Sequence, residues 1–460
     1  MNRSNLPSGG MARFDEPIIE VDELTRWVRD ARERTFDLVA DLSDEQLMGP
    51  RLSIVNPMLW EIGHTAWFEE KWVLRHTCHE KPIRADADAL YDSIAIPHDT
   101  RWDLPLPSRK ETIDYMCRVR DRVLEKLEAE LDAPAPDERL LYFALYCVYH
   151  ADMHNEAFTY TRQTLGYPAP HLSGGSHVSP SASRAAVEAD SALRGDAEIP
   201  GGEILLGSSQ NEPFVFDNEK WAHPVKVAPF AMARVALTQG EFLCFVEDNG
   251  YRRQDLWSEP GWKWREAVRA EMPLYWKRER DGILRRHFDR WVPLEEHLPV
   301  IHVNCFEAEA YCRWARRRLP TEAEWELAAS SPQIGVQTPA QKRRRYTWGN
   351  EAPTSDLANL DWQRGGCADV REYPGGDSVF GCRQMLGNVW EWTSTPFLPY
   401  PGFVADPYKE YSEPWFATHR VLRGGAWATR SRLVRNQYRN FYTPDRRDVW
   451  AGFRTCRAAG

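Results

Sequence analysis

The sequence lacks any hydrophobic run long enough to cross a membrane, and it lacks an excess of basic charge. No stretch approaches the roughly 18 consecutive apolar residues that a spanning helix needs. Its 58 Lys and Arg are outnumbered by 68 Asp and Glu, so the net charge of −10 gives no basic face for nucleic acid. We therefore expect neither membranes nor nucleic acids among its partners.

Paired cysteines are missing as well. The nine cysteines are widely scattered, odd in number and without a CxxC pair, which argues against both a disulfide framework and a zinc ribbon. The N-terminal stretch MNRSNLPSGGMARFDEP lacks the apolar core of a signal peptide. These features together predict a cytoplasmic protein with reduced thiols.

Length and composition favour more than one folded domain. A chain of 460 residues is too long for one comfortable core, and 42% hydrophobic with 27% charged residues is typical of globular proteins. The stretch from 168 to 202 is rich in Pro, Gly, Ser and Ala, which is the composition of a linker. Five of the 20 tryptophans precede it and fifteen follow it. We predict domains at 15–167 and 199–460, joined by a linker at 168–198.

The first domain has the periodicity of amphipathic helices. Its apolar residues recur at a spacing near 3.6, and Asn56-Pro57 is a start signal for the second helix. Four such helices predict a four-helix bundle, a fold that builds metal sites from facing side chains. The predicted helices cover residues 20–47, 57–76, 108–131 and 138–166.

The second domain has a different pattern. Many short apolar runs are broken by Gly and Pro, and only the stretches around 238–248 and 305–317 favour helices. We therefore expect a loop-rich α+β domain that depends on aromatic packing rather than on long regular elements.

The strongest chemical signal is the pair His150 and His154. Two residues four apart on a helix project about 40° apart, so both imidazoles can reach one ion. His64, on the second predicted helix, is a third candidate, and three such ligands leave coordination positions open. Glu156 is turned away from both histidines by helix geometry, so we do not expect it to be a ligand.

Spacing alone leaves two interpretations of these histidines open. They are either metal ligands or buried hydrogen-bonding groups. The apolar segment LYFALYCVY, directly before His150, favours a metal because unpartnered histidines are costly to bury there. The ligand chemistry allows Zn, Fe, Ni or Cu.

Both halves of the chain carry motifs that resemble known families. GHTAWF (63–68) and HADMHNEAF (150–158) resemble the DinB-like bundle of the nonheme-iron enzymes that make ergothioneine and ovothiol. The second half resembles the formylglycine-generating-enzyme (C-type-lectin-like) fold, and the two-domain order is similar to that of the sulfoxide synthases. The motifs that carry this second resemblance are GGEILLGSSQNEPFVFDNE (201–219), RRLPTEAEWELAA (317–329), LGNVWEWT (386–393), RVLRGGAW (420–427) and AGFRTC (451–456).

The resemblance implies an oxidative activity. The three histidines would bind Fe(II), and the enzyme would use O2 to couple a chalcogen donor to the imidazole of hercynine, a histidine betaine. Several motifs look closest to the selenoneine-synthase branch, which implies a selenosugar donor. The alternative is hercynine sulfoxide synthesis with cysteine or γ-glutamylcysteine, as in the ergothioneine branch. Residues 428–442 contain no cysteine, which argues against sulfatase maturation.

The resemblance also implies substrate contacts in the segment 439–442. Arg439, Asn440, Phe441 and Tyr442 match the family segment that holds hercynine, with Asn440 donating to its carboxylate. A quaternary ammonium needs aromatic faces, so Phe441 and Tyr442 would form part of a cage together with Trp415. The family usually has an acidic residue at the position of Tyr442, which implies a different mode of donor binding.

Further site residues follow from local similarity. Tyr408 or Tyr411 would donate a proton during oxygen activation and so steer the reaction away from thiol dioxygenation. Arg101, in the long connection at 91–107, and Arg446 would clamp a polar or anionic part of the donor. Met153 stands where ergothioneine-type enzymes have a Gln that orients the imidazole, so that contact is expected to differ.

Two other classes of function remain open. A DinB-like metal-dependent thiol transferase would need no O2. A betaine-binding protein would use the bundle only as a structural element. The tryptophans of PTEAEWE (320–326) and GNVWEWT (387–393) are expected to be packing residues.

Overall fold

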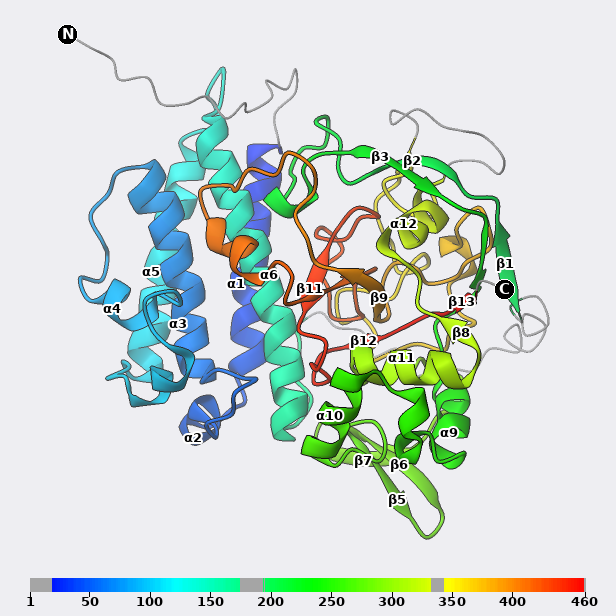
Figure 1. The fold of residues 1–460 in the computed structure, drawn as a ribbon. Coiled ribbons are helices and arrows are strands. Elements are labelled where there is room, and N and C mark those ends of the chain that lie inside the picture. Colours follow the sequence, from blue (N-terminus) through cyan, green and yellow to red (C-terminus); the bar gives the residue numbers. More distant parts are fainter. Residues whose placement is uncertain (1–18, 174–192, 194, 332–342, 459–460) are drawn as a thin grey trace.

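The computed structural model describes residues 19–173, 193, 195–331 and 343–458. It contains a helical bundle followed by a mixed α/β part, as predicted from the sequence (Figure 1). Residues 15–18 and most of the predicted linker lie outside the described residues. Strand β1 (Asp196–Ile199) begins inside the range predicted as linker. No helix of the described part is long and apolar enough to cross a membrane.

Four long helices form the bundle. α3 continues directly into a π-helical turn, η1 (Glu70–Thr77), and short helical segments lie in the connections at α2 (Asp44–Met48), α4 (Ala87–Tyr91) and η2 (His98–Asp103). The four main helices are α1 (Val21–Val39), α3 (Met58–Glu69), α5 (Arg109–Glu128) and α6 (Glu138–Leu165).

The helix ends follow from local sequence. Ser108 and Glu111 form a capping box at the start of α5, and the Asp137 carboxylate accepts the first free backbone N–H groups of α6. Gly166 ends α6 with a φ of 68°, a left-handed conformation that favours glycine. Trp60 and Trp67 of α3 are fully buried, which makes α3 a central helix of the bundle.

In its described residues, the second domain has short strands arranged in four small sheets. Their orders are β1-β4-β13-β8, β11-β10-β9-β12, β2-β3 and β5-β6-β7. The remaining strands are β2 (Gly202–Leu206), β3 (His223–Val227), β4 (Phe230–Ala233), β5 (Trp276–Glu279), β6 (Gly282–His287), β7 (Arg290–Pro293), β8 (Arg317–Arg318), β9 (Trp390–Pro396), β10 (Arg420–Arg423), β11 (Asn440–Tyr442), β12 (Ala451–Gly452) and β13 (Cys456–Arg457).

Capping boxes begin most of the helices that the structure describes in this domain. Thr238, Asn304 and Thr321 each accept a backbone N–H three residues on, where a Glu closes the box. These boxes start α9 (Gln239–Glu247), α11 (Cys305–Trp314) and α12 (Glu322–Ser330), while α10 (Glu259–Val268) starts after Ser258. The two helices predicted around 238–248 and 305–317 are therefore present. The helices α10 and α12 and the sheet β5-β6-β7 were not predicted from the sequence.

Tryptophans pack this domain, as expected. Trp325, Trp390 and Trp392 are almost completely buried. The Trp325 indole N–H donates to the Glu391 carboxylate at 2.7 Å, and Arg454 bonds the same carboxylate. Large buried indole surfaces thus replace long regular elements as the source of packing.

Helix α6 lies on the side of the bundle that faces the second domain (Figure 1). Its Glu156 carboxylate accepts hydrogen bonds from the Trp390 indole at 2.6 Å and the Thr429 hydroxyl at 2.5 Å. Asp152, one turn earlier, forms an ion pair with Arg432 at 2.7 Å. The two domains are therefore joined by buried polar contacts along one face of this helix.

The stability of this interface should depend on pH. Burial raises the pKa of Glu156 from 4.5 to about 7. The folded protein then binds more protons than the unfolded chain between these values, so the Glu156 contribution lowers the free energy of unfolding as pH rises through this window. The change is roughly 3 kcal/mol from about pH 4 to about pH 8.

Glu156→Gln tests this expectation. Denaturant unfolding at several pH values should show a flatter pH dependence for the variant and equal or greater stability at about pH 8. The same pH dependence in variant and parent would contradict the role assigned to this carboxyl group.

Candidate metal centre and active site

Three histidines converge inside the bundle. His150 and His154 lie on α6, and His64 faces them from α3. One ring nitrogen from each lies within 4.8 Å of the others, and the Nε2 atoms of His150 and His154 are 3.2 Å apart. The fold therefore brings together the three side chains predicted as metal ligands.

Two of the three rings are oriented by groups behind them. His64 Nδ1 lies 2.8 Å from the carbonyl oxygen of Tyr91, and His154 Nδ1 lies 2.6 Å from Oε1 of Glu61. Since both partners are oxygen acceptors, each Nδ1 donates a hydrogen, and in the neutral ring Nε2 then keeps a free lone pair. This is the tautomer that a metal ligand requires.

A glycine makes the His64 contact possible. A Cβ atom at Gly63 would lie 2.3 Å from the Tyr91 ring, so any larger residue would displace the tyrosine. The close approach keeps the Tyr91 carbonyl on His64. The motif GHTAWF thus combines a ligand with the small residue that orients it.

The environment of His64 and His150 favours the neutral form of both rings. Burial, with a smaller contribution from His154, lowers the pKa of both His64 and His150 well below 6.5. The Nε2 atoms of His150 and His154 face one another at 3.2 Å, and the Nδ1 atom of His150 is buried without a partner among the described residues. A cation between the Nε2 atoms satisfies this arrangement, so the residues fit a transition metal with open coordination positions.

A tyrosine loop from the second domain reaches this centre. We use this name for residues 406–412, which include η8 (Lys409–Tyr411). The Tyr411 hydroxyl lies 3.6 Å from Sδ of Met153, a residue that stands between His150 and His154 in the sequence of α6. The centroid of the Tyr408 ring is 5.0 Å from that of Phe68. Phe68 in turn stacks on His150 with ring centroids 3.7 Å apart. Both predicted tyrosines therefore lie beside the histidine cluster.

Arg101 borders the same centre. Its guanidinium lies 4.0 Å from the ring of Trp60, which stacks on His64. It donates to the Asn56 side-chain oxygen at 2.6 Å and to the carbonyl oxygens of Ser93 and Ile96. A buried guanidinium with only uncharged acceptors is suited to an anionic or strongly polar ligand.

Strand β11 carries the predicted hercynine segment. Phe441 stacks on Phe397 with centroids 4.0 Å apart and presents an edge contact to Tyr411 at 5.9 Å. Asn440 Oδ1 accepts from the backbone N–H of Phe441, and its amide is also bonded to Tyr442. Phe441 thus connects this strand to the tyrosine loop.

Trp415 and Arg446 lie at the edge of this region. Trp415 is 41% exposed, and its indole N–H donates to the carbonyl oxygen of Glu410. Arg446 is paired with Asp448 at 2.7 Å and lies 5.3 Å from the Tyr442 ring. Arg446 is therefore already neutralised by an acidic neighbour.

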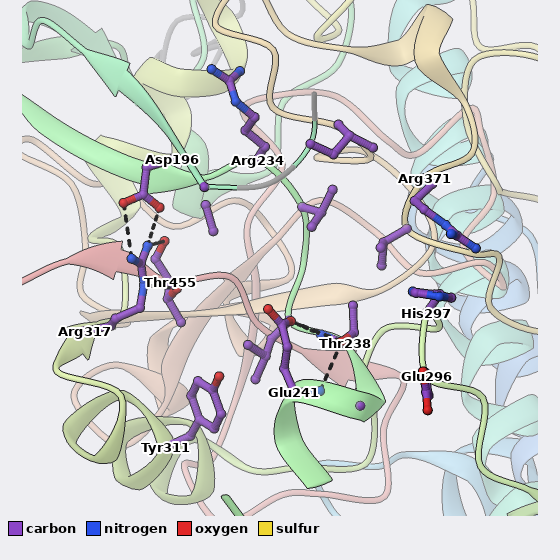
Figure 2. A pocket seen from close by; sticks show the side chains of 17 residues that line it. Asp196, Arg234, Thr238, Glu241, Glu296, His297, Tyr311, Arg317, Arg371 and Thr455 are labelled. Carbon is purple, nitrogen blue, oxygen red and sulfur yellow. Dashed lines mark hydrogen bonds and ion pairs between the residues drawn. The ribbon is translucent and has the colours of Figure 1, made fainter. Parts of the chain in front are cut away.

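A separate cavity of about 480 Å³ lies within the second domain. Figure 2 shows it between β1, α9 and the C-terminal strand, with Arg234, Glu241, His297 and Arg317 among its lining residues. None of the predicted site residues lines it. The histidine centre and this cavity are different places in the molecule.

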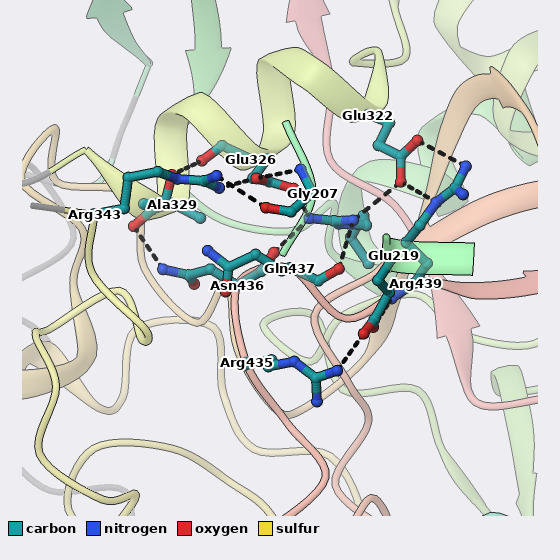
Figure 3. Close-up of polar contacts among 12 residues, drawn as sticks. Gly207, Glu219, Glu322, Glu326, Ala329, Arg343, Arg435, Asn436, Gln437 and Arg439 are labelled. Carbon is teal, nitrogen blue, oxygen red and sulfur yellow. Dashed lines mark hydrogen bonds and ion pairs between the residues drawn. The ribbon is translucent and has the colours of Figure 1, made fainter. Parts of the chain in front are cut away.

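Arg439 has a different position from the one predicted. Its side chain is 1% exposed and pairs with Glu322 at 2.8 Å (Figure 3). The guanidinium also donates to the carbonyl oxygens of Asn218 and Leu398. These contacts use its donors inside the protein because burial demands that they be satisfied. A structural role therefore replaces the predicted contact with substrate.

Comparison with known proteins agrees with both halves of this architecture. Residues 28–157 match the DinB superfamily, and residues 183–459 match the family described as sulfatase-modifying factor enzyme 1-like domain. The chain is 37% identical over 440 residues to a hercynine oxygenase of Mycolicibacterium thermoresistibile, covering 94% of each chain. The chain belongs to the ergothioneine-type sulfoxide synthase family.

Two further relatives show how the similarity is distributed. A hercynine oxygenase of Mycobacterium tuberculosis is 36% identical over 92% of this chain and 96% of its own length. A formylglycine-generating enzyme of Streptomyces coelicolor is 30% identical but matches only 57% of this chain, with 88% of its own length covered. The similarity to the hercynine oxygenases therefore spans both domains.

Glu61 is a residue of this site that sequence reasoning missed. It lies three residues before His64 in α3 and orients His154 of α6 across the bundle. The spacing of a carboxylate three residues before a candidate ligand was the available signal. Its partner on α6 follows only from the packing of the two helices.

Metal affinity tests this assignment. Glu61→Gln should weaken metal binding about 10- to 100-fold, because loss of the carboxylate reduces the basicity and orientation of His154. Glu70→Gln is the matched control, since Glu70 is a buried carboxylate of the same helical stretch that accepts from Tyr115 instead. Competition titration with a chelator measures both constants.

His150→Ala completes the test. This variant should lose metal binding altogether. Full metal occupancy in His150→Ala, or equal weakening by Glu61→Gln and Glu70→Gln, would contradict the assignment.

Proposed function

We propose that this protein is an Fe(II)- and O2-dependent synthase that joins a selenium or sulfur donor to the imidazole carbon of hercynine. The observation that carries the proposal is the cluster of His64, His150 and His154, of which the first two are buried, faced by the tyrosine loop and β11. Relatives that span both domains are named hercynine oxygenases.

Iron is the metal that suits the proposed chemistry. Fe(II) held by the three histidines would supply the activation of O2 next to the donor chalcogen. In the overall reaction the imidazole C–H and the donor chalcogen–H bonds break, and a carbon–chalcogen bond forms. One oxygen atom goes to the chalcogen, and the other leaves as water with both hydrogens, so O2 accepts four electrons.

The aromatic side of the site is suited to a betaine. A trimethylammonium group has no hydrogen to donate and is attracted to aromatic faces. Phe441, with Tyr442 and Trp415 nearby, would provide such faces. The Asn440 amide carries a second hydrogen, which we propose it donates to the hercynine carboxylate.

The other side of the site is suited to the donor and to proton transfer. Arg101 would bind the anionic or polar part of the donor, with its charge unmatched by any of its three acceptors. Burial raises the pKa of Tyr408 to about 12, and burial also raises that of Tyr411. Both phenols are therefore protonated at neutral pH, and we propose that one of them donates the proton.

The donor is proposed to be a selenosugar. Met153 and Tyr442 depart from the residues that ergothioneine-type enzymes use, and Met153 offers a thioether where those enzymes have an amide. Cysteine or γ-glutamylcysteine is the second candidate, favoured by the hercynine oxygenase names of the relatives. All nine cysteines are free thiols, which supports the predicted cytoplasmic location.

Oxygen consumption and product analysis test the proposed function. The iron-loaded protein, given hercynine with a selenosugar, cysteine and γ-glutamylcysteine in competition, should consume O2 and release one carbon–chalcogen product. Mass spectrometry should find the selenosugar adduct in excess. A dominant sulfur adduct would overturn the selenium donor, and turnover that persists without O2 would favour a thiol transferase and overturn the oxidative reaction.

Ligand binding tests the betaine site separately. Phe441→Ala should weaken hercynine binding about 3- to 30-fold, as expected for loss of a desolvated cation–π contact. Histidine has an ordinary ammonium that retains other hydrogen-bond partners, so its binding should change much less. Calorimetry with both ligands measures the difference, and equal losses would contradict the aromatic cage.

A further inference from the structure

The tyrosine loop is held at both of its ends by one buried carboxylate. Asp217 lies in the short helical turn η3 (Asp217–Glu219). One of its oxygens accepts from the Ser412 hydroxyl, and the other accepts from the backbone N–H of Asp406 at 3.4 Å. Asp217 and Ser412 are both buried. A single side chain thus fixes the first and the last residue of the loop.

Neighbours of Asp217 add further contacts to the same loop. The Asn218 amide donates to the Ser412 hydroxyl oxygen at 3.0 Å, and Lys220 pairs with the Asp406 carboxylate at 2.5 Å. The Phe216 ring stacks on Tyr411 with centroids 4.8 Å apart. Residues 216–220 therefore form a platform under the loop, which we call the FDNEK platform.

The loop is also connected to the helix of the histidine cluster. The Tyr142 hydroxyl, on α6, donates to the Asp406 carboxylate at 3.1 Å. Tyr411, at the other end of the loop, meets Met153 on the same helix. The FDNEK platform, the loop and α6 are thus linked in one network that ends at the proposed reaction centre.

The charged form of Asp217 is energetically unfavourable at this buried position. Burial, with a smaller contribution from the like charge of Asp406, raises its pKa to about 6. The hydrogen bond from Ser412 and the positive charge of Lys220 partly offset this effect, while Tyr142 faces the same network through Asp406. Because the unfolded value is 3.8, the folded protein loses stability as pH rises from about 4 to about 6. Groups with such shifts cluster at functional sites.

We propose that Asp217 is a positioning residue that holds Tyr408 and Tyr411 at the histidine cluster by fixing both ends of their loop. The inference rests on the proposed function for its consequence in catalysis but on the contacts of Asp217 for its mechanical part. Loss of the carboxylate should free the loop while leaving the three histidines in place.

Hydrogen–deuterium exchange tests the mechanical part without turnover. Exchange in the peptide that covers residues 404–415 should become at least about tenfold faster in Asp217→Ala, which loses both hydrogen bonds. Asp217→Asn should show an intermediate effect, because its amide oxygen can still accept from Ser412. Ser412→Ala, which removes only a hydroxyl, should also speed exchange and provides a variant with little risk of misfolding.

Glu307→Gln is the matched control. Glu307 is a buried carboxylate of the same domain that accepts from the Tyr251 hydroxyl, and burial raises its pKa as well. Its substitution should leave exchange of residues 404–415 unchanged. Unchanged loop exchange in both Asp217→Ala and Ser412→Ala would overturn the proposal.

The catalytic consequence is measured as the ratio of coupled product to donor that is oxidised without coupling. In Asp217→Ala the yield of coupled product per O2 consumed should fall several-fold, and oxidised donor without hercynine should rise, with metal affinity unchanged. Partial recovery in Asp217→Asn would support positioning. Faster loop exchange with an unchanged ratio would overturn the role in positioning, whereas parent protein that turns over without O2 would overturn only the proposed function.

Discussion

The structure depends above all on the two opposite faces of α6. One face presents His150 and His154 to His64 inside the bundle, and the other presents Asp152 and Glu156 to the second domain. Because these residues alternate along one rigid helix, the position of the second domain and the position of the metal ligands are set together. A shift of the helix would disturb both.

The two domains make complementary contributions to the site. The bundle supplies the histidine cluster and the buried Arg101 guanidinium, whose hydrogen-bond acceptors are uncharged, and such groups are costly to bury without ligands. The second domain supplies the tyrosine loop and β11. Both are short segments, and contacts with neighbouring residues fix their positions. The FDNEK platform and the Glu322–Arg439 pair provide these contacts. The site is thus formed by the helices of the bundle on one side and, on the other, by a loop that contacts with the FDNEK platform hold in position.

Sequence reasoning located the helices and the histidines because both have a local signal. The 3.6-residue period marks α1, α3, α5 and α6, and HADMH places two ligands on one helical face. The β5–β7 sheet and α12 had no comparable pattern, since strands of this domain are short and packed by isolated tryptophans. Glu61 and Asp217 act across the fold, so only the structure shows their partners. Arg439 shares a motif with substrate-binding residues but is turned towards Glu322.

The central claim is that one metal ion binds at the three histidines and that residues of the second domain bind hercynine next to it. Anomalous diffraction from crystals of the Fe(II)-loaded protein with hercynine tests it most directly. The account predicts a single iron peak among the Nε2 atoms of His64, His150 and His154, with the betaine between α6 and β11. Iron bound away from these histidines, or hercynine in the separate cavity of the second domain, would contradict it.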